Sequence, residues 1–171
     1  MMKYVKGPDF PTGAIIRGRD GIRTAYETGH GGVVIEGRAA IEERKEGLYQ
    51  IVITEVPFQV NKAALFEKIA LLIKDKKLEG GSEVRDESDR DGLRVVVELH
   101  RSAQPMYVLN NLYKHTQLRS SFFIYMLALV DGQPQVLGLR DVLQHYIDFR
   151  RVVIRHRSEY DLRKAQERAH I

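Results

Sequence analysis

The segment from Glu87 to Gly92, with Glu98 following six residues later, nearly fits a calcium-binding loop. In such a loop, carboxylates at fixed positions surround the cation and a glycine permits a sharp turn. However, Arg94 occupies a position that is usually apolar, and residues 95–97 are valines, typical of a strand where the loop needs a helix. We therefore interpret the segment as a solvent-exposed hairpin turn, with a calcium-binding module as the alternative.

No other spacing of reactive side chains matches a known catalytic arrangement. The six histidines lack the helical spacing of a metalloprotease, and Ser120 and Ser121 lack the flanking glycines of a hydrolase nucleophile. The glycines at 29, 31 and 32 precede no Lys-Ser/Thr pair, so we interpret them as a flexible loop and not as a phosphate cradle. The chain has no cysteine, which excludes disulfides and thiolate chemistry. We expect neither a catalytic residue nor a metal site.

Basic side chains gather in two stretches. Arg17, Arg19 and Arg23 lie close together, and residues 101–119 contain Lys114 and His115 but no aspartate or glutamate. Lysine, arginine and polar amides are the groups that contact nucleic-acid phosphates. The net charge of +4 and the pI near 9.3 are compatible with a polyanionic partner. An ordinary solvated basic face is the alternative interpretation.

Composition indicates a folded, non-membrane chain. Of the 171 residues, 43% are hydrophobic and 29% are charged, which allows a packed core. No apolar run is long enough to span a bilayer, and the first residues do not resemble a signal peptide. We therefore expect a cytoplasmic protein.

The predicted helices and strands do not follow the regular strand–helix–strand order of a parallel sheet. We therefore expect an α+β fold with a mixed or antiparallel sheet and flanking helices. A hairpin is predicted from a strand over 33–41, a turn at Glu46-Gly47 and a strand over 49–54. A buried strand is predicted over 122–130. The other predictions are a helix over 21–27, a helix capped by Asn61, a hairpin turning at Asp91-Gly92, a helix starting at Pro105 and a turn over 130–133.

Residues 139–171 form the last predicted element, a single uninterrupted helix. Apolar residues such as Val142, Phe149 and Val153 recur at alternating spacings of three and four, which is the seam of a coiled coil. No stop signal precedes Ile171, so we expect the helix to be truncated. We divide the chain into a domain over 1–137 and the start of a coiled-coil helix over 138–171.

Several strings of this sequence resemble the A subunits of bacterial type IIA DNA topoisomerases, gyrase more closely than topoisomerase IV. They cover the tower domain and the start of the long coiled coil of that family. The strings are residues 7–12, 53–62, 85–94, 109–118, 127–134 and 162–171, which occur in family order.

The resemblance implies an activity for the parent protein. That protein would be an ATP-hydrolysing topoisomerase that introduces negative supercoils by passing one duplex through a transient double-strand break in another. A tyrosine in an Arg-Tyr-Thr string makes the break. None of the eight tyrosines here is so flanked. The chain is therefore expected to be inactive alone, with the tyrosine upstream of Met2.

The resemblance also implies partners. It predicts that this chain binds double-stranded DNA and helps to bend it, within an assembly of two A and two B subunits. The B subunit is expected to hold Mg2+ and ATP, and no cofactor is expected in this chain. The alternatives are a topoisomerase IV A-subunit fragment, or a purely structural connector to the dimer exit gate.

Positions that match the family suggest which residues contact DNA. They are Arg19, Arg38 and Lys62, together with Lys114 and His115. His30 is a further candidate, although the family commonly has a permanent cation there, whereas an imidazole is charged only when protonated.

Overall fold

The computed structural model describes residues 1–45 and 47–170. They divide into two compact units, each of which is described by itself. One unit contains residues 1–6, 20–31 and 124–171, and the other contains residues 7–19 and 32–123. We call them the helical unit and the sheet unit. The predicted α+β class is confirmed, because antiparallel sheets are combined with four helices. The division at residues 137/138 stays a prediction.

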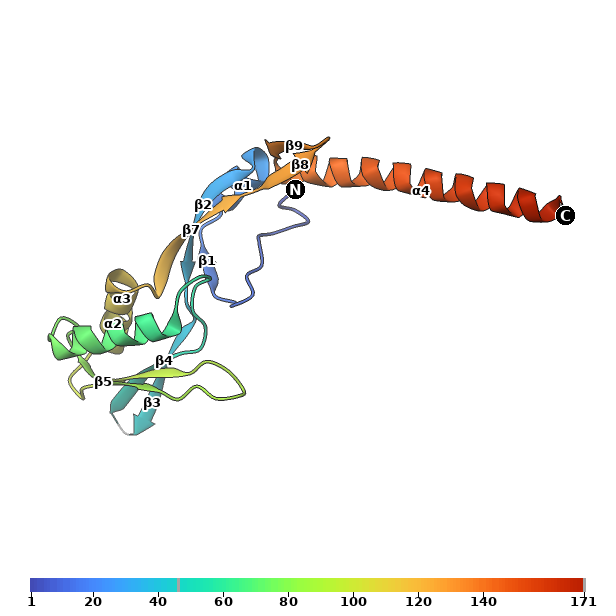
Figure 1. Cartoon of the computed structure of the whole chain (residues 1–171). Helices are drawn as coiled ribbons and strands as arrows, with labels where there is room; N and C mark the ends of the chain where they lie inside the picture. Colours follow the sequence, from blue (N-terminus) through green and yellow to red (C-terminus); the bar gives the residue numbers. More distant parts are fainter. Residues whose placement is uncertain (46, 171) are drawn as a thin grey trace. The chain divides into compact units, whose positions relative to one another are not determined.

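The core of the sheet unit is a four-stranded antiparallel sheet with two helices on one face (Figure 1). The strands, in spatial order, are β3 (Ala39–Lys45), β4 (Leu48–Ile53), β6 (Val95–Leu99) and β5 (Gly81–Asp86). Ile51 and Val97 are fully buried and pair with each other across β4 and β6. They pack in one apolar cluster with Ile69 of α2 (Lys62–Lys74) and Leu112 of α3 (Pro105–His115).

Local signals place these two helices as predicted. The Asn61 side chain accepts hydrogen bonds from the backbone N–H groups of Ala63 and Ala64, at 2.8 and 3.3 Å. These bonds satisfy donors that have no partner within the first turn of α2. Pro105 occupies the first turn of α3, where its missing N–H costs no helical hydrogen bond. The hairpin around Asp91-Gly92 is also confirmed, because β5 and β6 pair on either side of it.

The opposite face of the four-stranded sheet carries a connected network of ion pairs. Glu98 accepts from both Arg44, at 2.5 Å, and Arg85. Glu87 lies 3.0 Å from Arg85 and 3.2 Å from Arg94, which also reaches Glu42 at 3.2 Å. The pKa of Glu42 is lowered by the hydrogen bond from Gln50 and by Arg94. The ion pairs join β3, β5, β6 and the residues beside β5 and β6, and Gln50 of β4 is linked to them through its hydrogen bond to Glu42. Three arginines and three glutamates balance one another in this network.

A second, three-stranded sheet has the order β1 (Ile15–Arg17), β2 (His30–Glu36) and β7 (Arg119–Tyr125). Successive side chains of a strand point to opposite faces. Val33 and Ile35 of β2 are therefore buried on one face, whereas Val34 is exposed on the other. Phe122 packs on Phe10 and Phe58, with ring centroids 5.1 and 5.6 Å away.

Two predicted strands are wrong in extent. The strand over 33–41 is split at Gly37, where the chain leaves β2 and enters β3 of the other sheet. The Gly37 N–H donates to the Leu118 carbonyl at 2.7 Å, and a Cβ at Gly37 would lie 2.5 Å from the Glu55 carbonyl oxygen. Of the predicted turn at Glu46-Gly47, Glu46 lies outside the described residues.

The predicted strand over 122–130 is likewise two strands, β7 and β8 (Leu127–Val130), separated at Met126. The Met126 N–H donates to the Gly29 carbonyl at 2.7 Å, and its carbonyl accepts from the Leu137 N–H at 3.1 Å. The prediction of burial is also wrong, because Phe123 is 76% exposed and Leu129 is 74% exposed. An apolar run cannot by itself reveal that one face of a sheet lies open.

The helical unit contains α1 (Asp20–Thr28), the hairpin of β8 and β9 (Gln133–Val136), and α4 (Leu139–Ala169). The predicted helix over 21–27, the turn over 130–133 and the long final helix are confirmed. Ile171 lies outside the described residues. Within residues 1–45 and 47–170, no helix is both long and apolar enough to cross a membrane.

The sequence suggested a flexible loop at the glycines near residue 30, and this prediction is wrong. Gly29 has a left-handed backbone conformation with φ of +87°, which favours glycine, and β2 begins at the next residue. A Cβ at Gly31 would lie 2.6 Å from the Gly21 carbonyl oxygen of α1. These glycines therefore permit close packing between α1 and its neighbours.

The Asn61 cap can be tested by substitution. Asn61→Ala removes both hydrogen bonds to the first turn of α2, so we expect the free energy of unfolding to fall by about 1 kcal/mol in urea titrations. Asn110→Ala, on the exposed side of α3, is the matched control and should change it by less than about 0.5 kcal/mol. Equal effects of the two substitutions would contradict a capping role for Asn61.

Candidate nucleic-acid interface

A basic groove of about 420 Å3 lies between α2 and α3 in the sheet unit. Lys68 lines it from α2, and Lys114 and His115 line it from the last turn of α3. Ala64, Leu65, Thr116 and Gln117 complete the lining, so no acidic side chain is among the residues that form it. We call this site the α2–α3 groove.

The chain after α3 holds the groove in shape. The Thr116 hydroxyl donates to the Leu112 carbonyl at 2.6 Å and accepts from the Leu118 N–H at 3.1 Å. Leu112 and Leu118 are both fully buried in the core. The turn that carries Lys114 and His115 is therefore anchored from the inside, while these two side chains are exposed.

Two of the predicted DNA contacts are already engaged in ion pairs. The Lys62 ammonium lies 2.8 Å from the Asp86 carboxylate, and the Arg38 guanidinium lies 3.0 Å from that of Glu55. The hydrogen bond from Lys62 lowers the pKa of Asp86 to about 2, with help from Ser88. A phosphate would have to compete with these carboxylates for either cation.

The remaining predicted contacts are Arg19 and His30, which are both exposed. Arg19 belongs to the sheet unit and His30 to the helical unit, where the Thr28 hydroxyl lies 3.0 Å from its Nδ1. Of the six predicted residues, the structure thus brings only Lys114 and His115 together. Lys68 completes their groove and was not predicted, because one lysine on a helix face carries no signal of what lies opposite it.

Sequence reasoning also missed Glu36, the one charged side chain among the buried residues described. It is 2% exposed and lies on β2 between Arg17 of β1 and Arg119 of β7. Arg119 approaches the carboxylate at 2.6 Å, and Arg17 donates to its other oxygen through Nε. The hydrogen bond to Glu36 raises the pKa of Arg17.

The acidic segment considered as a calcium loop has other bonding partners. Glu87 and Glu98 are both held by arginines of the network on the four-stranded sheet. Strands flank the segment, whereas the calcium loop would need helices. Within the described parts of the chain, no three His, Asp or Glu side chains are grouped so that they could hold a metal ion.

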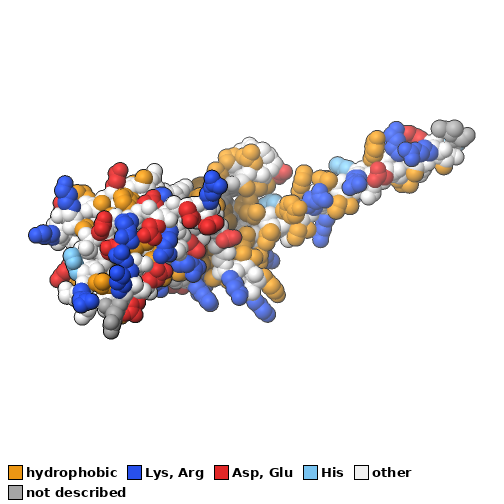
Figure 2. Space-filling model, turned by 90° about the horizontal axis from the view of Figure 1, so that it is seen from below, with side chains coloured by type: hydrophobic (Ala, Val, Ile, Leu, Met, Phe, Trp, Pro, Cys, Tyr) orange, Lys and Arg blue, Asp and Glu red, His pale blue; other side chains and the backbone are white. Residues whose placement is uncertain are grey.

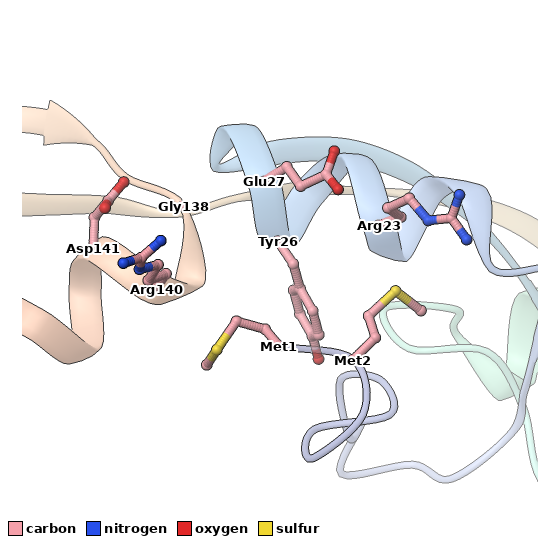
Figure 3. Close-up of a pocket in the computed structure, with 8 residues that line it drawn as sticks. All are labelled: Met1, Met2, Arg23, Tyr26, Glu27, Gly138, Arg140 and Asp141. Atoms are coloured by element: carbon pink, nitrogen blue, oxygen red, sulfur yellow. The ribbon is translucent and has the colours of Figure 1, made fainter.

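Basic and acidic side chains alternate over much of the face in Figure 2, so the surface is not uniformly cationic. The helical unit has a pocket of about 490 Å3 of mixed charge, which contains none of the six predicted DNA contacts, although Arg23 of the first basic stretch lines it (Figure 3). The Tyr26 ring points from α1 towards Met1, and burial raises the pKa of its phenol. The α2–α3 groove differs from this pocket in having no acidic residue in its lining.

Comparison with known proteins identifies the family. Residues 1–171 match the family of DNA gyrase/topoisomerase IV A subunits. The chain belongs to this family. It is 55% identical over 173 residues to the DNA gyrase A subunit of Dehalogenimonas lykanthroporepellens and 56% identical over 173 residues to that of Pseudomonas aeruginosa. The resemblance to gyrase A subunits predicted from the sequence strings is confirmed.

These relatives are much longer than the chain. All of the chain is covered in both comparisons, but only 21% and 19% of the two gyrase A subunits. The chain thus spans about a fifth of their length.

The ion pair of Lys62 predicts a pH dependence of stability. The pKa of Asp86 is about 2 in the folded chain, below the value of about 3.9 in an unfolded chain. The carboxylate therefore stabilises the fold above about pH 4, and this contribution is lost as the pH falls through about 2. We expect Asp86→Asn to lower the melting temperature near pH 7, and the difference from wild type to vanish near pH 2.

Asp91→Asn is the control for this experiment, since Asp91 has no ion pair within the described residues. Its melting temperature should follow that of wild type over the whole range. A difference between Asp86→Asn and wild type that persists unchanged down to about pH 2 would show that the pair does not form.

Proposed function

We propose that this chain is the arm of a type IIA topoisomerase A subunit that holds the duplex flanking the cleaved site and helps to bend it. The observation that carries the proposal is the α2–α3 groove, in which Lys68, Lys114 and His115 converge without an acidic neighbour among the lining residues. Lysine ammonium groups are point charges that bind phosphates without reading base sequence. We therefore expect DNA binding that is independent of sequence.

Bending gives the arm a mechanical task. Bending a site of 20–30 base pairs costs on the order of 1–6 kcal/mol, so several phosphate contacts have to offset it. Such contacts keep the DNA bent only if the cations are held in place on the protein. The buried Leu112 and Leu118 fix the turn of Lys114 and His115 to the core, which supports a load-carrying role.

The wider assembly is part of the same proposal. The parent enzyme would carry out ATP-dependent negative supercoiling in the cytoplasm, with two A and two B subunits. Mg2+ and ATP would be held by the B subunit, as the resemblance to the family implies. None of the eight tyrosines has the Arg-Tyr-Thr context, so we expect the isolated chain not to cleave DNA.

Binding of a labelled duplex of about 20–30 base pairs tests the groove. We expect the pair of substitutions Lys68→Gln and Lys114→Gln to weaken binding at least three-fold at about 100 mM salt. The slope of log affinity against log salt should become less steep by about 0.9 for each phosphate that the variant no longer neutralises.

A double substitution with the same change in charge serves as the control, Lys45→Gln combined with Arg90→Gln, at exposed positions outside the groove. This variant should bind within about two-fold of wild type, since it removes charge but leaves the phosphate-binding side chains in place. Equal losses of affinity in the groove and control variants would contradict the groove as the binding site. Wild-type binding that ignores salt between about 50 and 200 mM would contradict DNA binding through phosphates altogether.

A structural connector to the exit gate is the second candidate, and α4 favours it. This helix runs for 31 residues without one buried side chain among those described, which suits an element that packs against another helix. Charge reversal of Lys68 and Lys114 to Glu in the full-length enzyme separates the two functions. DNA gripping predicts loss of supercoiling, because repulsion replaces attraction, whereas a connector predicts activity close to wild type.

A further inference from the structure

The open face of the three-stranded sheet carries a second cationic site, centred on Glu36. Val34 and Glu36 lie on this face of β2, opposite the buried Val33 and Ile35. Arg17, Val34, Glu36 and Arg119 line a shallow depression there. All four residues belong to the sheet unit.

The buried Glu36 carboxylate holds the two arginines by hydrogen bonds. The carboxylate is 2% exposed, and its two oxygens accept from different guanidinium groups, Arg17 at one and Arg119 at the other. Charged hydrogen bonds of this kind hold an arginine in one orientation. Both arginines therefore contact the same carboxylate and line the same depression.

The two cations remain open to solvent. The side chain of Arg17 is 62% exposed and that of Arg119 is 45% exposed. Apart from Glu36, no described acidic side chain pairs with either of them. Arg17 donates to Glu36 through Nε, so its terminal N–H groups are available to a ligand. Two guanidinium groups and one carboxylate leave a charge of +1 at the site.

Tyr113 fixes Arg119 from a second side. The Arg119 guanidinium lies 5.4 Å from the centroid of the Tyr113 ring, within the range of a cation–π contact. The Tyr113 hydroxyl in turn donates to the Gly37 carbonyl at 2.9 Å, which ties the ring to the end of β2. Arg119 is thus held by a buried carboxylate and by an aromatic ring.

The geometry points to a phosphate clamp formed by Arg17 and Arg119, positioned by Glu36, that binds one phosphodiester of duplex DNA. This inference rests on the proposed function, since it names a further contact of the same DNA-holding arm. A single ion pair would need only one arginine, so the second is in excess of what neutralising Glu36 requires. Paired guanidinium groups present parallel N–H donors that match the oxygens of one phosphate.

Removal of either arginine tests the clamp with the full chain and a labelled duplex of about 20–30 base pairs. We expect Arg17→Gln and Arg119→Gln each to weaken binding about three- to ten-fold at about 100 mM salt. Each should reduce the salt slope by about 0.9, which corresponds to one phosphate. Because both side chains hold the same phosphate, the double variant should also reduce the slope by only about 0.9.

Arg90→Gln is the matched control, because it removes the same charge from an exposed hairpin position of the same unit. It should leave the salt slope unchanged and the affinity within about two-fold of wild type. Arg17→Lys should rescue only part of the loss. An ammonium group keeps the charge but cannot hold Glu36 through one nitrogen and present a planar pair of donors to the ligand.

The substitution Glu36→Gln tests whether Glu36 acts by positioning the two arginines or only by its own charge. The substitution makes the chain more positive by one charge, so a purely electrostatic surface would bind DNA more tightly. The clamp predicts weaker binding, by about two- to ten-fold, because the arginines then have to be ordered by the ligand. Tighter binding by a variant with wild-type thermal stability would overturn the positioning role of Glu36.

The outcomes distinguish this inference from the proposed function. If wild type shows no salt-dependent duplex binding, the proposed function fails and the clamp fails with it. If wild type binds and the groove variants weaken it, but Arg17→Gln and Arg119→Gln behave like Arg90→Gln, only the clamp is overturned. Thermal unfolding of each variant confirms that weaker binding does not reflect a failure to fold.

Discussion

The packing of α2 and α3 on one face of the four-stranded sheet is the interaction on which the rest of the sheet unit depends. Ile51, Val97, Ile69 and Leu112 meet there and are fully buried. Complete burial of aliphatic side chains of this size stabilises a fold by about 1.5–3 kcal/mol each, more than any exposed ion pair. The helices therefore stay in place, and the α2–α3 groove keeps its shape whether or not an anion is bound.

The main core occupies one face of that sheet. The other face carries, besides the buried Val52 and Val96, charged side chains that mostly neutralise one another. Arginines and glutamates of β3, β6, β5 and the residues beside β5 and β6 form a connected network. Such pairs contribute little stability singly, but they keep this face soluble and balance its charge. The α2–α3 groove differs from this face, because its lining has two lysines and a histidine but no carboxylate.

The Glu36 site shows a different use of a carboxylate. In the network, acidic and basic groups are both partly exposed, whereas Glu36 is buried and its two arginines are open to solvent. A buried charge without a partner is costly, so Glu36 needs at least one arginine beside it. The second arginine contacts the other oxygen of the same carboxylate. The binding surface that we propose would thus combine the lysines of the groove with two arginines on the three-stranded sheet.

Much of the fold could be predicted from the sequence, because its signals are local. Asn61, Pro105 and the Asp131-Gly132 turn act on the backbone within a few residues, and the helices and the hairpin that they mark lie where expected. The strands over 33–41 and 122–130 were predicted too long, since the breaks at Gly37 and Met126 arise from hydrogen bonds to distant segments.

The candidate site depended much more on tertiary structure. Residue types and the family resemblance indicated that Lys114 and His115 could contact DNA phosphates. The sequence strings by themselves determined the family. Only the folded chain decided that Lys68 lies opposite them, that Lys62 and Arg38 face carboxylates, and that Glu36 joins two arginines from other strands. The physical reason is that charge acts through space: a basic residue can be counted along the chain, but its partner is chosen by folding.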